Sequence, residues 1–152
     1  MAIFPFSSSN KTNIWAGIGA GLWAVSRATD PVHKGRITKS RGMHIGSLGI
    51  LYCVETQSLT TPFMVLSVPD TEKVISDVWP EEWVLPFKIQ PLGTPYRQMH
   101  KDEVMRLLPT AAASASNNIS NVINITPPAA FAPSRLTDRD WAVLVEQLAD
   151  AR

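Results

Sequence analysis

The sequence predicts an α+β fold in which a mostly antiparallel sheet is flanked by helices. Three observations predict it: a capped helix near the N-terminus, several apolar strand-like runs broken by turns and prolines, and an amphipathic helix near the C-terminus. The chain has 152 residues, of which 45% are hydrophobic and 18% are charged. Because roughly 100 to 150 residues is the commonest domain size, we expect a single domain over 1–152. Its core should span about 8–108, followed by a long connection over 110–134 and a C-terminal helix over 136–150.

The first predicted helix spans Lys11–Ala20 and is followed by a strand over Leu22–Ser26. The polar run 7–10 offers residues that cap a helix N-terminus, and Gly21 is typical of a helix end. Three glycines lie in or directly after this helix, and each costs about 1 kcal/mol relative to alanine in a helix interior. We therefore expect them to permit close backbone packing or the approach of a ligand.

A basic segment over 27–44 follows and is predicted to be a loop. It holds five cations and one acid, which are Arg27, Lys34, Arg36, Lys39, Arg41 and Asp30. A solvated loop is the ordinary interpretation of such a run, and a positive patch that meets phosphates is the alternative. The net charge of the whole chain is only +1, so any such patch is local.

The middle of the chain predicts a hairpin, one more strand and a short helix. The strand-like runs 48–55 and 63–68 are joined by a polar turn. The run 84–90 predicts a further strand, which its prolines should confine to a sheet edge or interrupt at a bulge. A helix is expected over 99–108, and Pro109 should end it.

The C-terminal third combines a connection with one helix. The segment 110–134 is rich in Ala, Ser, Asn and Pro, and we expect it to run over the surface with 122–125 as its apolar part. Thr137 and Asp140 have the spacing of a capping box. Trp141 begins the apolar face of the helix that follows and is expected to anchor in the core.

The side chains indicate no catalytic or metal site. The three histidines have no metal-ligand spacing, and the single cysteine, Cys53, is expected to be a buried apolar residue in a reducing compartment. The glycine-rich segment 17–21 has a helix before it and a strand after it, which reverses the order of a dinucleotide-binding motif. Glu81 and Glu82 are adjacent on an extended segment and should point to opposite sides. We expect no enzyme activity, no cofactor and no metal.

The apolar segment 14–25 bears on the compartment of the protein. It is too short to span a bilayer, and its two tryptophans and three glycines make a poor signal-peptide core. We expect a cytoplasmic, intracellular protein without a membrane partner.

The spacing of three tryptophans is the most informative feature of the sequence. A tryptophan is usually a core residue, but Trp79 and Trp83 lie in a segment with Pro and Glu that is typical of a loop. Two large rings on such a loop are not both expected to be buried. If Trp23 joins them, the three indoles form an aromatic box, and Asn13, ten residues before Trp23, supplies polar contacts to its occupant. Such a box is suited to recognition rather than reaction.

These segments, taken in order, resemble the YTH domains. In 13–26 an Asn precedes a Trp by ten residues across a short helix, as at the opening of that family. The segment 50–67 is similar to the family's strand, polar hairpin and second strand, and 78–89 is similar to its loop with two tryptophans. Those tryptophans are four residues apart here, whereas such YTH domains usually have five. The resemblance covers roughly residues 8–104 and extends to EVE domains. It implies a PUA-like curved sheet or open barrel flanked by helices.

The resemblance also implies a function, namely a reader that flips N6-methyladenine out of nucleic acid, with DNA favoured, into a tryptophan cage. The implied cage is Trp23, Trp79 and Trp83, and the implied base-edge contacts are Asn13, Asn10 and the backbone carbonyl of Ala24. The implied phosphate contacts are Lys34, Arg36, Lys39, Arg41 and Lys101.

The resemblance further implies a targeting module of a modification-dependent restriction system, with a fused or associated nuclease or NTPase as its partner. Four alternatives stay open. They are a reader of 5-methyl- or 5-hydroxymethylcytosine, an RNA-binding protein for N6-methyladenine, an enzyme on a PUA-like fold that acts on nucleotides or RNA, and a structural or protein-interaction domain whose tryptophans all belong to the core. The enzyme requires an acid, a base or a nucleophile that converges on the box.

Overall fold

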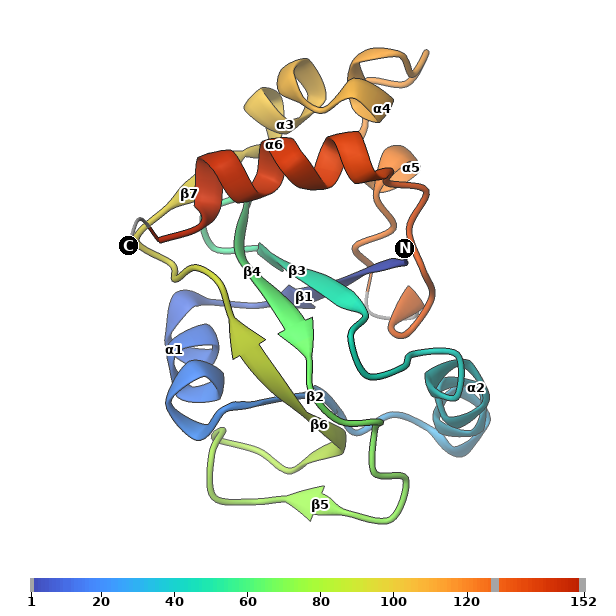
Figure 1. Cartoon of the computed structure of the whole chain (residues 1–152). Helices are drawn as coiled ribbons and strands as arrows, with labels where there is room; N and C mark the ends of the chain where they lie inside the picture. The colour runs from blue at the N-terminus through green and yellow to red at the C-terminus, as the bar shows by residue number, and fades with distance from the viewer. Residues whose placement is uncertain (1, 127–128, 151–152) are drawn as a thin grey trace.

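A mixed sheet curls into a half-barrel and carries helices on both faces, which confirms the predicted α+β class (Figure 1). The computed structural model describes residues 2–126 and 129–150. The main strand order is β1-β3-β4-β6-β2, with β5 beside β6 and β7 beside β4; β1 and β3 are parallel and the other pairs are antiparallel. The strands are β1 (Ile3–Ser8), β2 (Leu22–Ser26), β3 (Leu48–Cys53), β4 (Ser58–Val65), β5 (Val74–Ile75), β6 (Trp83–Pro91) and β7 (Gln98–His100).

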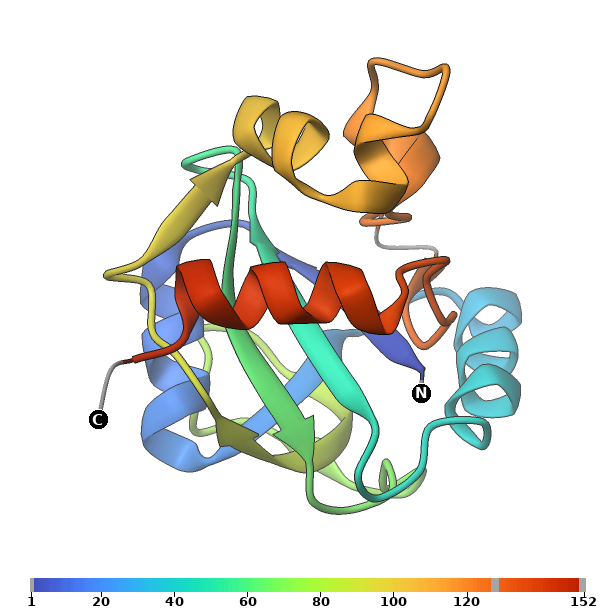
Figure 2. The ribbon, with the colours of Figure 1, turned by 45° about the horizontal axis from the view of Figure 1, so that its top comes forward.

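The helices divide into two groups around this sheet. They are α1 (Lys11–Ala20), α2 (Asp30–Ser40), α3 (Lys101–Leu107), α4 (Pro109–Ala112), α5 (Ile119–Val122) and α6 (Asp138–Leu148). The long helix α6 crosses the sheet over β4 and β7. Helices α3, α4 and α5 lie along one side of α6 (Figure 2). Across residues 2–126 and 129–150, none of these helices has the length and apolarity needed to cross a bilayer.

Strand β3 separates two hydrophobic cores. Leu51 and Cys53 join the core inside the half-barrel, and Ile50 and Tyr52 join the core under α3 to α6. Successive side chains of a strand point to opposite faces of the sheet, so all six residues of β3 are buried. The buried position predicted for Cys53 is confirmed.

Local signals gave several elements correctly. The bounds of α1 and β2 match the prediction, because the Asn10 side chain caps α1 and Gly21 ends it in the left-handed conformation at φ 68°. The predicted hairpin is also present, but its second strand spans 58–65 rather than 63–68, which leaves a shorter turn over 54–57. Strand β1 was not predicted, although the apolar residues at the start of Ile3–Ser8 are typical of a strand.

The prediction that the basic segment 27–44 is a loop is wrong for residues 30–40, which form α2. Its helix signals are Thr29 at the N-cap, Asp30 and a proline in the first turn, and Lys39 in the last turn. The arginine and serine on its inner side, Arg36 and Ser40, are buried. Tertiary packing therefore stabilises a segment whose mean hydropathy gives no hint of a buried face.

The prolines of β6 do not confine it to an edge, because β6 lies between β4 and β2. The bulge that was the other expectation is present. Leu85 and Pro86 together oppose the single residue Ala24, and Leu85 has a positive φ of 56°. A bulge removes the need for a ladder hydrogen bond at Pro86, so a proline is accommodated inside the sheet.

The segment 110–134 is not the exposed connection that its composition predicts. It contains α4 and α5, and buried side chains occur along it, among them Ala111, Ile119, Val122, Ile123, Ile125 and Phe131. Positions 127 and 128 of this segment lie outside the described residues. The segment covers one face of the sheet, a long-range packing that composition does not reveal.

The capping box of α6 is confirmed, and it also holds α4. The Asp140 carboxylate accepts hydrogen bonds from the backbone N–H and hydroxyl of Thr137 and from the backbone N–H and hydroxyl of Thr110. Burial alone would raise the pKa of Asp140, but these four donors outweigh it and hold the pKa below its ordinary value. Trp141 is half-buried against the core of α3 to α6, a lesser anchor than predicted.

We predict that Asp140→Asn lowers the free energy of unfolding at pH 7 by about 1.5–3 kcal/mol, because an amide nitrogen then faces the donors of Thr110 or Thr137. A carboxyl whose pKa is lower in the folded state stabilises the folded protein at pH values above its unfolded pKa of about 4. This stabilisation is lost as the pH falls through the folded-state pKa. The difference from wild type should therefore shrink below about pH 4. Urea unfolding at pH 7 and below about pH 4 measures this difference in the free energy of unfolding. Asp138→Asn, an exposed change in the same turn, is the control and should cost less than about 1 kcal/mol; equal losses in both variants contradict the account.

Candidate functional site

Three indoles from three segments meet at the seam of the half-barrel between β1 and β2. Trp79 and Trp83 stack with ring centroids 4.1 Å apart and an angle of 13°. Trp23 of β2 meets both rings edge-on, at 5.8 Å from Trp79 and 5.4 Å from Trp83. The structure thus brings together the three rings that sequence spacing singled out.

The expectation that Trp79 and Trp83 are not both buried is wrong. Trp23, Trp79 and Trp83 are 1%, 3% and 6% exposed. Stacking explains this, since the Trp79 ring of the loop and the Trp83 ring at the start of β6 cover a face of each other, and Trp23 covers their edges. The Trp79 indole N–H also donates to the backbone carbonyl of Asn13 at 2.9 Å, which ties the loop to α1.

Gly17 fixes the position of Trp23. A Cβ at Gly17 would lie 2.8 Å from the Leu22 carbonyl oxygen and 3.0 Å from the Trp23 ring. The helix therefore packs directly on the indole, as the expectation of close backbone packing requires. Gly19, two residues on, has open space around it.

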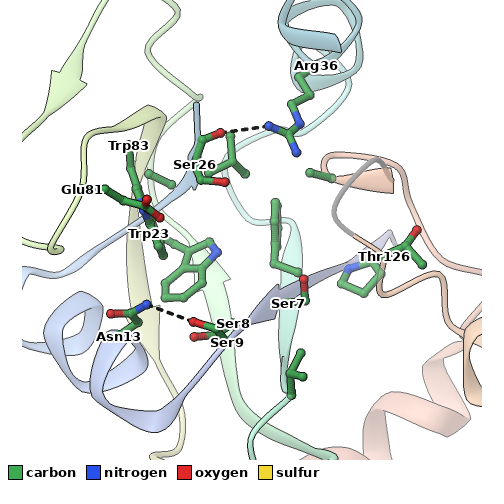
Figure 3. Close-up of a pocket in the computed structure, with 16 residues that line it drawn as sticks. Ser7, Ser8, Ser9, Asn13, Trp23, Ser26, Arg36, Glu81, Trp83 and Thr126 are labelled. Atoms are coloured by element: carbon green, nitrogen blue, oxygen red, sulfur yellow. Dashed lines mark hydrogen bonds between the residues drawn. The ribbon is translucent and has the colours of Figure 1, made fainter. Parts of the chain in front are cut away.

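A cavity of about 280 Å³ opens beside these rings (Figure 3). Trp23 and Trp83 line it, whereas Trp79 lies behind Trp83 and does not. The remaining walls come from β1, α1, β2, α2 and the segment near Thr126. We call this space the tryptophan cavity.

Of the predicted base-edge contacts, Asn13 and Ala24 line the tryptophan cavity and Asn10 does not. Asn10 instead accepts the backbone N–H of Asn13 and caps α1. The Asn13 amide reaches the Ser9 hydroxyl at 3.5 Å, so it lies at the rim. Ala24 sits opposite the bulge of β6, where the ladder register skips it.

Of the predicted phosphate contacts, Arg36 lines the tryptophan cavity. Its guanidinium is buried and donates to the Ser26 carbonyl at 3.0 Å, and desolvation by burial lowers its pKa from the ordinary value. Lys34, Lys39 and Arg41 are exposed on or just after α2. Lys101 lies apart from these cations, because it begins α3 and lines a second cavity.

The two adjacent glutamates point apart, as predicted. Glu81 lines the tryptophan cavity and accepts a long 3.4 Å hydrogen bond from the Trp83 indole. Glu82 faces Arg27 at 3.8 Å on the surface. Among residues 2–126 and 129–150, no group of three His, Cys, Asp or Glu side chains could hold a metal ion.

Sequence reasoning missed the serines at the end of β1. Ser7, Ser8 and Ser9 line the tryptophan cavity, although they were considered as capping residues. Three consecutive serines after an apolar run are the signal that could have placed them at a strand end. Thr126, from the C-terminal third, had no such signal.

Comparison with known proteins finds relatives in structure and none in sequence. No protein-family model matches the chain, and no curated protein sequence does. The YTH domain of Zygosaccharomyces rouxii MRB1, solved with N6-methyladenosine RNA, has a TM-score of 0.59 at 11% identity, over 99% of this chain and 88% of that one. The Mmi1 YTH domain in an RNA complex has a TM-score of 0.58 at 13% identity, over 96% and 80%.

A third solved domain agrees with these two. The Pho92 YTH domain in complex with m6A has a TM-score of 0.51 at 14% identity, over 70% of this chain and 64% of that one. The chain therefore has the fold of the YTH domains, as the resemblance of its segments implied.

We predict opposite effects for two alanine substitutions in α1. Gly17→Ala should lower the free energy of unfolding by about 1–3 kcal/mol, because the new methyl group displaces Trp23 from α1. Gly19→Ala should raise it by about 0.5–1 kcal/mol. The new methyl group meets open space, so only the gain in helix propensity remains. Urea unfolding followed by tryptophan fluorescence measures both; a stabilised Gly17→Ala protein contradicts the packing described.

Proposed function

We propose that this chain reads N6-methyladenine in a nucleic-acid strand by taking the flipped base into the tryptophan cavity. One observation carries the proposal. Trp23 and Trp83 wall a cavity that Asn13, Ala24 and the buried Arg36 also line. The chain has this cavity on a fold that solved domains use in complexes with N6-methyladenosine RNA and with m6A. Large apolar walls with a few converging polar groups are typical of small-ligand sites.

The ring geometry favours a base that lies against two perpendicular indoles over a base that lies between two parallel ones. A base between two parallel rings needs them about 7 Å apart, twice the contact distance of carbon atoms. Trp79 and Trp83 are at 4.1 Å and leave no such gap, whereas Trp23 and Trp83 meet at 81°. The base then stacks on Trp83 and presents its edge to Trp23, whose two sides are taken by α1 and by the other two indoles, and Trp79 supports Trp83 from behind.

Aromatic contact offsets the cost of extracting the base. Leaving the stack costs a few kcal/mol, and stacking on an aromatic side chain returns about 1–3 kcal/mol per base. Burial of the N6-methyl group adds about 0.8 kcal/mol. An unmethylated amino group in the same place loses a hydrogen bond to water without replacing it, which costs about 1–3 kcal/mol.

Two polar groups are proposed to recognise the base edge. The Asn13 amide at the rim is assigned to a ring nitrogen, and the Ala24 carbonyl, opposite the bulge, to the exocyclic N–H. Asn10 acts through α1, since its cap holds the turn that carries Asn13. This differs from the direct base contact that the resemblance implied for Asn10.

The cations of α2 are proposed to meet phosphates. Arg36 reaches the tryptophan cavity from the inner side of α2, and Lys34, Lys39 and Arg41 extend the positive surface outward. Such contacts give affinity that falls with salt and carry little sequence information. They suit a reader that accepts a modified base in several contexts.

Binding without catalysis is the mechanism that these residues support. Glu81 lines the tryptophan cavity, and its carboxylate accepts a hydrogen bond from the Trp83 indole N–H. RNA is the strand in two of the solved complexes, so RNA is the first ligand to titrate. The sequence-based preference for DNA, and a targeting role beside a nuclease or NTPase, remain predictions.

We predict that single-stranded RNA with one N6-methyladenine binds at least about tenfold more tightly than the unmodified strand, since 1.4 kcal/mol is a factor of ten. Calorimetric titration measures this, with DNA of the same sequence and with strands carrying 5-methylcytosine or 5-hydroxymethylcytosine in parallel. Equal affinity for all strands refutes the reader. Preference for a cytosine mark refutes the adenine assignment.

A matched pair of tryptophan variants locates the site. Trp83→Phe should reduce the ratio of affinities for methylated and unmodified RNA. Trp15→Phe should leave it unchanged, because Trp15 lies on the outside of α1 against Tyr96. Both substitutions keep an aromatic ring and so limit the loss of packing that Trp23→Ala would cause in the core.

A further inference from the structure

The second cavity, which Lys101 lines, lies on the other face of β3 from the three tryptophans. It measures about 630 Å³, a size typical of small-ligand sites. Tyr52 of β3 lines it, whereas the neighbours of Tyr52 in the chain, Leu51 and Cys53, belong to the core that holds the tryptophans. Successive side chains of a strand point to opposite faces, so the sheet separates this cavity from that core. We call it the tyrosine cavity.

The Tyr52 phenol is a buried donor without a partner. The residue is 8% exposed, and its hydroxyl has no hydrogen-bond partner within residues 2–126 and 129–150. The hydroxyl is not sealed in the core but opens onto the tyrosine cavity. Burial raises the pKa of this phenol, with a smaller contribution from Cys53, so the hydroxyl keeps its proton at neutral pH. Because a buried tyrosine hydroxyl usually has a partner, the cavity is the place where an acceptor can reach this one.

The loop that leads into α5 adds donors to the lining, because its acceptors are already used. The Ser116 oxygen accepts from the Asn118 backbone at 3.1 Å and from the Asn121 amide at 2.9 Å. The Asn118 side-chain oxygen accepts the backbone N–H of Ser120 at 3.0 Å. These bonds hold the loop, and they leave the Ser116 hydroxyl hydrogen and the Asn118 NH₂ group for a ligand.

The charges on the lining favour an anion. Lys101 lines the tyrosine cavity, and its ammonium makes no ion pair in the part of the chain that the structure describes. Asp102 is the one carboxylate of the described lining; its side chain is 85% exposed and lies 3.4 Å from the His100 imidazole. Water and salt screen an exposed charge, so Asp102 opposes an anion only weakly. The rest of the lining includes an apolar wall formed by Met105, Ile119 and Ile125.

We propose that the tyrosine cavity binds a small organic oxyanion, a carboxylate or a phosphate ester with an apolar body. The oxyanion accepts hydrogen bonds from the Tyr52 hydroxyl and the Lys101 ammonium, and the body lies against the apolar wall. Hydrogen bonds to a charged acceptor are about twice as strong as neutral ones, so this lining selects an anion over a neutral molecule of the same shape. The site is independent of the proposed reading of a methylated base, since it lies across the sheet from the tryptophans.

Fluorine NMR of protein labelled with 3-fluorotyrosine tests the site. The chain has two tyrosines, and the second, Tyr96, is 88% exposed and outside the cavity. Benzoate and phenyl phosphate are the probes, and the tighter of the two identifies the oxyanion. At least one should shift the Tyr52 resonance to saturation and leave that of Tyr96, which Tyr96→Phe assigns. Benzyl alcohol, a neutral molecule of similar size, should bind at least about tenfold more weakly. If neither anion shifts Tyr52, or the alcohol binds equally well, the proposal is overturned.

Two adjacent charge variants should have opposite effects. Lys101→Gln should weaken binding of the tighter anion about tenfold, and Asp102→Asn should strengthen it about twofold, because the first removes an attraction and the second a screened repulsion. Lys73→Gln removes an exposed lysine of another segment and should change nothing. Calorimetric titration measures all three. Equal affinities in the three variants contradict the proposal.

Tyr52→Phe separates binding from folding. It should weaken binding of the tighter anion about fivefold and leave the urea unfolding midpoint unchanged, because the hydroxyl has no partner within the protein to lose. Unchanged affinity contradicts the proposal. RNA with one N6-methyladenine should leave the Tyr52 fluorine resonance in place. If RNA shifts it and neither small anion does, the cavity belongs to nucleic acid and the proposal fails; if an anion binds here and no RNA binds the protein, only the proposed reader function fails.

Discussion

The packing of the Trp23 indole against the backbone of α1 at Gly17 is the contact on which the rest of the site depends. It sets the distance between α1 and β2, and it leaves the far side of the ring to meet Trp79 and Trp83. Trp79 closes the arrangement by bonding to the carbonyl of Asn13 on the same helix. One helix therefore fixes the rings and the amide together, so displacement of Trp23 disturbs every group that the proposed base would contact.

The helix bounds that were predicted correctly depended on local physics, and the predictions of secondary structure and burial that failed depended on distant partners. Asn10 and Gly21 bracket α1 because a cap and a left-handed residue act within one turn, and the capping box at Thr137 acts in the same way. Helix α2 was missed because its buried face carries Arg36, whose burial depends on β2. The Trp79–Trp83 stack has no sequence signature, because a loop's path decides whether two rings meet.

The self-packed tryptophans distinguish this site from a simple three-sided box. Because Trp79 and Trp83 already bury each other's faces, the aromatic surface that lines the tryptophan cavity belongs to the corner that Trp23 and Trp83 form. In the proposed reader, selectivity for a methyl group comes from a tight apolar corner, and affinity comes from the cations of α2. The four-residue spacing of Trp79 and Trp83 and their stacking in this structure are consistent with that division of roles.

The most direct measurement of the central claim is an NMR spectrum of N6-methyladenosine carrying a ¹³C-labelled methyl group, bound to the protein. The account predicts an upfield ring-current shift of the methyl resonance, with nuclear Overhauser contacts to the ring protons of Trp23 and Trp83. A methyl resonance that is unshifted at saturation, or that contacts Trp15 on the outer face of α1, would contradict it.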